Sequence, residues 1–174
     1  MDFAAISNFL LEVFYIIIGI IMLNTAILTL QDKTHKAKIG TFLFWGLLGI
    51  IFIFGPYIPS ALVGGMLVVI AALTLTKQVK PGAIKALDEK FGEEQAKKLG
   101  VKIFIPSLCI ALASLGIAQF TPISGTAAIG LAAFIAIVVT FVITKAKPKV
   151  FFEESDRMLQ SVSTTSILPQ LLAA

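Results

Sequence analysis

The side chains of this chain that could take part in chemistry are few, and their densest group lies near the C-terminus. The stretch 161-SVSTTSILPQLLAA-174 places hydroxyl side chains just before Ile-Leu-Pro-Gln and then returns to apolar residues. Hydroxyl and carboxamide groups bind small polar ligands by hydrogen bonds, and they can satisfy backbone groups that a proline frees inside a membrane. The candidate substrate-binding residues here are Thr164, Thr165, Ser166, Pro169 and Gln170.

A second group of polar residues lies in the first hydrophobic segment. Asn24 and Thr25 could hydrogen-bond to another helix at around 1 kcal/mol or line a solute pathway, and the pattern favours packing. Glu12 precedes Leu30 by about 27 Å along a helix, which places it near the outer headgroups and favours a structural role. His35 lies in a loop among lysines, where we expect a solvated side chain.

No pattern in the chain indicates a catalytic or metal site. There is no G-x-x-x-x-G-K loop, no H-E-x-x-H motif and no pair of carboxylates inside a hydrophobic segment. The single cysteine, Cys109, lies in an apolar run and predicts neither a disulfide nor a metal ligand set. We therefore expect a protein that is not an enzyme and that has no cofactor and no protein-bound metal.

The composition is that of an integral membrane protein. Of 174 residues, 57% are hydrophobic and 14% are charged, whereas globular domains average about 45–50% and about 25%. Since a helix crosses the hydrocarbon core with about 20 apolar residues, we expect an all-α, polytopic bundle forming a single membrane domain over 1–174. The predicted spans are residues 9–30, 39–55, 57–76, 101–120 and 125–144.

All 14 lysine and arginine residues lie in three regions, namely the first loop, the long loop with its edges, and the segment after the fifth span. With five spans these regions share one side of the membrane, which the positive-inside rule makes cytoplasmic. The N-terminus is then outside. We expect a multi-pass protein of the bacterial inner (cytoplasmic) membrane, and the basic pI reflects topology rather than nucleic-acid binding.

Two helical segments have a recognisable pattern. Residues 81–99 predict a cytoplasmic amphipathic helix that begins near Pro81 and stops at Gly100. In the fifth span, small residues recur at every fourth position, which lets helix backbones approach closely. These residues are Ala128, Ala132, Ala136, Thr140 and Thr144.

The C-terminal stretch 161–174 allows two interpretations. As a helix, its residues after Ser161 would reach only about 20 Å, which is short of the roughly 30 Å hydrocarbon core. It therefore either enters the membrane and returns, as re-entrant elements of transporters do, or it is a polar tail.

Five stretches, in order over essentially the whole chain, favour the first interpretation. They are LEVFYIIIG (11–19), DKTHKAKIGTFLFWGLLGIIFIFG (32–55), KIFIPSL (102–108), ESDRML (154–159) and ILPQLLA (167–173). Together they resemble a bacterial membrane family, formerly without a known function, whose members are described as a subunit of 5-oxoproline (pyroglutamate) transporters. The family is placed in the ion-transporter superfamily, and its members continue well beyond this length. The chain is therefore expected to be an N-terminal, incomplete transporter half.

The resemblance implies a secondary transporter for a small organic anion that works by alternating access with coupled Na⁺ or H⁺. It implies a second membrane subunit, a dimeric assembly, and residues 167–173 as the first arm of a re-entrant element. The hydroxyls of 164–166 would hold the carboxylate, and Gln170 would pair with the lactam. The alternatives are a non-transporting membrane scaffold or assembly protein, or a non-functional truncated fragment.

Overall fold

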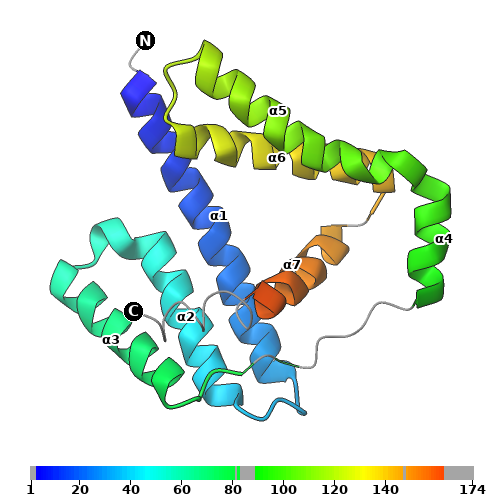
Figure 1. Ribbon diagram of the computed structural model, residues 1–174. Coiled ribbons are helices and arrows are strands. Elements are labelled where there is room, and N and C mark those ends of the chain that lie inside the picture. Colours follow the sequence, from blue (N-terminus) through cyan, green and yellow to red (C-terminus); the bar gives the residue numbers. More distant parts are fainter. Residues whose placement is uncertain (1–2, 81, 83–88, 147, 163–174) are drawn as a thin grey trace. The chain divides into compact units, whose positions relative to one another are not determined.

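The computed structural model describes residues 3–80, 82, 89–146 and 148–162, and this part of the chain is helical without strands (Figure 1). The all-α prediction is confirmed for these residues. The elements are α1 (Phe3–Gln31), α2 (Lys38–Phe54), the 3₁₀ turn η1 (Gly55–Tyr57), α3 (Ser60–Leu75), α4 (Glu89–Leu99), the 3₁₀ segment η2 (Gly100–Phe104), α5 (Ile105–Phe120), α6 (Gly125–Thr144) and α7 (Pro148–Val162).

In the described part of the chain, four helical stretches are long and apolar enough to cross a membrane. They are Phe3–Gln31, Lys38–Tyr57, Glu93–Phe120 and Gly125–Thr144. The expected span 57–76 is instead α3, an apolar helix of 16 residues, which is about 24 Å long at 1.5 Å per residue. It is shorter than predicted because η1 and Pro59 delay its start. Five spans are therefore not confirmed.

The chain divides into two compact units, and each is described separately. Unit 1 comprises residues 1–14 and 86–148, and unit 2 comprises residues 15–85 and 149–174. The long helix α1 contributes its first residues to unit 1 and the remainder to unit 2.

Unit 1 is built on a hairpin in which α5 and α6 run side by side (Figure 1). Ser124 caps α6 by accepting a hydrogen bond from the Ala127 amide at 3.4 Å. The Ser124 amide in turn donates to Ser7 Oγ of α1 at 3.1 Å, which fixes the turn of the hairpin against the first residues of α1.

The stripe of small residues on α6 packs as predicted over most of its length. Ala128, Ala132 and Ala136 are buried. The last two members differ from the prediction, because Thr140 and Thr144 are exposed and their hydroxyls donate to carbonyls one turn earlier at 2.7 Å. The close-packed part of the stripe therefore ends at Ala136.

Unit 2 contains α2, α3, α7 and the larger part of α1. Glycines lie at the crossing of α1 and α2, where a Cβ on Gly49 would stand 3.0 Å from Gly19 O and 2.9 Å from Leu23 Cγ. The hydrophobic core next to this crossing consists of Ala26, Phe44, Trp45, Ile70 and Val79, with Leu159 of α7 packed against it. Small residues thus bring two backbones together, and larger ones fill the space beside them.

Two helices are amphipathic and charged. The helix α4 lies within the predicted segment 81–99, whose residues 81 and 83–88 are outside the described part. It ends as predicted at Gly100, whose φ of 50° is left-handed. The other helix, α7, was not predicted from the sequence. Its exposed face carries a Lys149–Glu153 ion pair at 3.5 Å.

The ends of α3 and α6 have an unusual residue in the left-handed region. Lys77 (φ 56°) and Lys145 (φ 53°) occupy the position that glycine normally takes after a helix. The Lys77 amide donates to Thr74 O at 3.0 Å and the Gln78 amide to Leu73 O at 2.9 Å, the two bonds of a Schellman motif. The Lys145 amide donates to Phe141 O at 2.8 Å.

Candidate functional site

The five residues predicted to bind a substrate are all outside the described part of the chain. Thr164, Thr165, Ser166, Pro169 and Gln170 lie outside the described residues, as does the re-entrant candidate apart from Ser161 and Val162, which belong to α7. The two pathway or packing candidates, Asn24 and Thr25, lie on α1 in unit 2. The candidate site is therefore built from the buried polar groups of unit 2.

Buried threonines in unit 2 generally satisfy their hydroxyls within their own helix. Thr29 Oγ1 donates to Thr25 O at 2.8 Å, and Thr74 Oγ1 donates to Ile70 O at 2.9 Å. These side chains are 1% and 3% exposed. A threonine that bonds to the carbonyl four residues earlier needs no partner from another element, so these two residues carry no functional signal.

Asn24 and Thr25 depart from this pattern. Thr25 is 0% exposed, and neither its Oγ1 nor the buried Nδ2 of Asn24 has a hydrogen-bond partner among the residues that the structure describes. Leaving a buried donor unsatisfied costs about 1–3 kcal/mol. The next residue, Ala26, belongs to the hydrophobic core. Two adjacent donors are thus held in an apolar setting without an acceptor.

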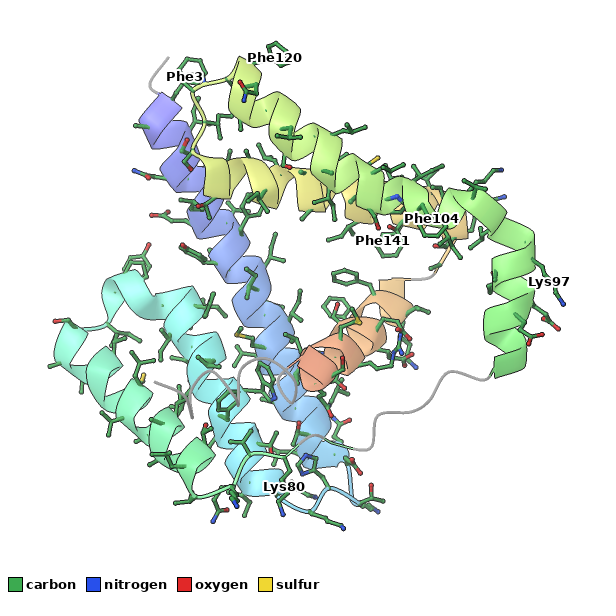
Figure 2. All side chains as sticks on the ribbon, viewed as in Figure 1. Phe3, Lys80, Lys97, Phe104, Phe120 and Phe141 are labelled. Atoms are coloured by element: carbon green, nitrogen blue, oxygen red, sulfur yellow. The ribbon has the colours of Figure 1, made fainter. Side chains whose placement is uncertain are left out.

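The loops after α1 and α3 are joined at one end of unit 2, where Lys80 lies (Figure 2). The prediction that His35 is solvated is wrong, since its side chain is buried. The Ala37 amide donates to His35 Nδ1 at 3.1 Å, so Nε2 carries the proton and donates to Lys80 O at 2.9 Å. Both ring nitrogens are therefore hydrogen-bonded, and the imidazole links the loop after α1 to the loop after α3.

A hydroxyl from α2 strengthens the same junction. Thr41 Oγ1 donates to Lys80 O and accepts from the Lys80 amide, each at 3.1 Å. One side chain thus satisfies both backbone groups of a loop residue, as a neighbouring strand would. The bonds hold the end of the loop after α3 beside the start of α2.

The C-terminal part of α7 is attached next to this junction. Gln160 Oε1 accepts from the Gly82 amide at 2.7 Å, while its Nε2 donates to Asp156 Oδ1 at 2.9 Å. A Cβ at position 82 would stand 2.5 Å from Gln160 Oε1 and 3.2 Å from His35 Cδ2. A side chain at position 82 would therefore displace the end of Gln160 and its hydrogen bond to the Gly82 amide. Sequence reasoning missed the whole arrangement.

The other polar candidates are not gathered into a site. Glu12 is exposed on α1, and Cys109 is a free, partly buried thiol on α5. Among the described residues, no three histidine, cysteine or acidic side chains come together in a way that could hold a metal ion.

The sequence of most of the chain matches a known protein family. Residues 12–174 match the family DUF979, which is described as a protein of unknown function. The chain belongs to the DUF979 family. The DUF979 match includes Asn24 and Thr25, the loop junction, α7 and the C-terminal stretch. Neither the curated proteins nor the solved structures include a match to the chain.

Proposed function

We propose that this DUF979 protein is a subunit of a secondary transporter for a small organic anion, 5-oxoproline. It works by alternating access in the bacterial inner membrane, with coupling to Na⁺ or H⁺. The observation that carries the proposal is the pair of buried, unpartnered donors on α1, Asn24 Nδ2 and Thr25 Oγ1. Polar groups inside a membrane segment are costly, and they mark solute pathways.

The same donors argue against a scaffold that only anchors a partner. A scaffold gains nothing from unsatisfied donors in its interior, whereas replacing them by apolar groups would stabilise it. A transporter needs donors that become satisfied when the solute enters. The resemblance of the five stretches to the 5-oxoproline transporter subunits points to the same activity.

The proposed orientation places the lysine-rich loops in the cytoplasm. The bonds between Thr41 and Lys80 bring the start of α2 and the loop after α3 to the same end of unit 2. In unit 1, the α5–α6 hairpin likewise brings Lys102 and Lys145 to one end. In this proposal α3 makes the remaining crossing, helped by a locally thinner bilayer, so that all lysine-rich regions share one side.

Uptake of labelled 5-oxoproline tests the proposal. Cells lacking other uptake of this compound would express the chain together with the membrane subunit encoded beside it, and each protein alone as a control. We expect saturable uptake that needs both proteins and that collapses when the Na⁺ or the proton gradient is removed. Equal uptake with and without the chain would refute the transporter, and copurification of the two subunits without uptake would favour the scaffold.

Labelling of single cysteines tests the orientation separately. In a Cys109→Ser background, a cysteine at Lys36 should react with a membrane-impermeant reagent only after the cells are opened. A cysteine at Tyr57, which is 82% exposed at the other end of the α2–α3 hairpin, should react in intact cells. The reverse pattern would contradict the proposed topology without bearing on uptake.

A further inference from the structure

The two unpartnered donors of α1 differ from the other buried helical threonines of unit 2 that the structure describes within a helix interior, Thr29 and Thr74. Thr29 and Thr74 are equally buried, and each bonds to the carbonyl four residues earlier. Thr25 has the same helical setting but leaves its hydroxyl without a partner, next to the Nδ2 group of Asn24. A helical threonine can donate to the carbonyl four residues earlier, but Thr25 does not make this bond.

The chemistry of the two groups restricts what can satisfy them. The Asn24 amide nitrogen can only donate, and the Thr25 hydroxyl can donate, so the matching group is a hydrogen-bond acceptor. Glu12 is the only charged residue within α1, and it lies about 18 Å from Asn24 along the helix. A carboxylate at this position would be buried without a countercharge, which is very unfavourable. An uncharged carbonyl oxygen, with two lone pairs, fits two neutral donors.

The residue that follows the two donors lies in an apolar core. Ala26 follows directly and is 1% exposed, within a core that includes the large aromatic side chains of Phe44 and Trp45. Hydrogen bonds are stronger in such a setting than in water. Because Thr25 is completely buried, a solute reaches it only after the helices of unit 2 move apart, which is the motion that alternating access supplies.

We infer that Asn24 and Thr25 bind the amide or lactam carbonyl oxygen of the transported solute. This inference rests on the proposed function and deepens it. It divides recognition into an uncharged part, held by α1, and a carboxylate held elsewhere. Both donors lack an acceptor within the described part of the chain, and the solute carbonyl would supply it.

Uptake and stability measured on the same variants test this inference. The variants are Asn24→Leu and Thr25→Val in the two-subunit complex, with Thr74→Val as the matched control because its hydroxyl is satisfied inside α3. Each α1 variant should raise the half-saturation concentration for labelled 5-oxoproline about five- to tenfold, the effect of losing one hydrogen bond. Thr25→Ser keeps the hydroxyl and should retain near-normal affinity, as should Thr74→Val.

Two further readouts separate binding from a structural role. The melting temperature of Thr25→Val should equal or exceed that of the wild type, because an unsatisfied hydroxyl is removed. Competition by cyclopentanecarboxylate, a ring anion without the lactam, should be the same in wild type and in both α1 variants. A half-saturation concentration unchanged in both variants, or equal losses for both ring anions, would overturn the inference while leaving transport intact. No uptake by the wild-type complex would overturn the proposed function, and this inference with it.

Discussion

The crossing of α1 and α2 allows the sharpest prediction about stability. Replacing Gly49 by alanine places a methyl group 3.0 Å from Gly19 O and 2.9 Å from Leu23 Cγ. One of these neighbours is backbone and cannot rotate away, so the helices must separate or bend. Gly46 lies on the same helix, and a Cβ there meets nothing within 4 Å, which makes Gly46→Ala the matched control.

The magnitude follows from comparing the two variants. Each gains about 1 kcal/mol of helix propensity, and this gain cancels in the difference. What remains is the overpacking cost at Gly49, about 1–3 kcal/mol. For a chain of this size, 1 kcal/mol shifts the melting temperature by about 2–4 °C. Gly49→Ala should therefore melt about 2–12 °C below Gly46→Ala.

Thermal unfolding in detergent would measure this difference through the fluorescence of Trp45. It is the single tryptophan of the chain and is 1% exposed on α2, so its emission reports directly on the helices that cross. Equal melting temperatures for the two alanine variants would refute the close approach of the backbones.

Three more predictions concern other contacts. His35→Phe removes the acceptor of the Ala37 amide, so hydrogen exchange at that amide should become about five- to tenfold faster. An unchanged exchange rate would argue against the hydrogen bond between Ala37 and the imidazole. Gln160→Leu should speed exchange of the Gly82 amide in the same way, whereas protection that persists would mean that α7 is held by other bonds. Ala132→Leu inserts a large side chain into the buried stripe of α6 and should lower the stability of the protein by about 1–3 kcal/mol. The control for thermal unfolding is Val138→Leu, because Val138 is 48% exposed on the same helix. Similar melting temperatures for both variants would contradict the packing of the stripe.

The elements that long apolar runs specify could be predicted from the sequence. α1, α2, α5 and α6 follow from runs of the length that a bilayer requires, and Gly100 ends α4 as expected. Helices on the polar side were harder to predict. α7 has its first and last turns among charged and hydroxyl residues, where hydropathy gives no signal, although Lys149 and Glu153 have helical spacing.

The candidate site could be predicted only in part, because its decisive features are relationships between distant residues. Asn24 and Thr25 stood out as polar residues in an apolar segment, but their lack of partners depends on how the other helices pack. His35 bonds to a carbonyl 45 residues away, and Gln160 bonds to an amide 78 residues away. No local sequence pattern encodes such pairings. For this reason the lysine-rich loop around His35 predicted a solvated side chain, whereas the fold buries it.

The left-handed lysines that end α3 and α6 have a consequence for biosynthesis. A residue with a Cβ is less stable than glycine in this conformation by about 1–2 kcal/mol, so Lys77→Gly and Lys145→Gly would each relax a helix end. Each would also delete a cation from the border of an apolar helix, where lysine and arginine residues bias the orientation in which membrane proteins insert. Each lysine thus combines a less stable backbone conformation with a cation at the end of an apolar helix.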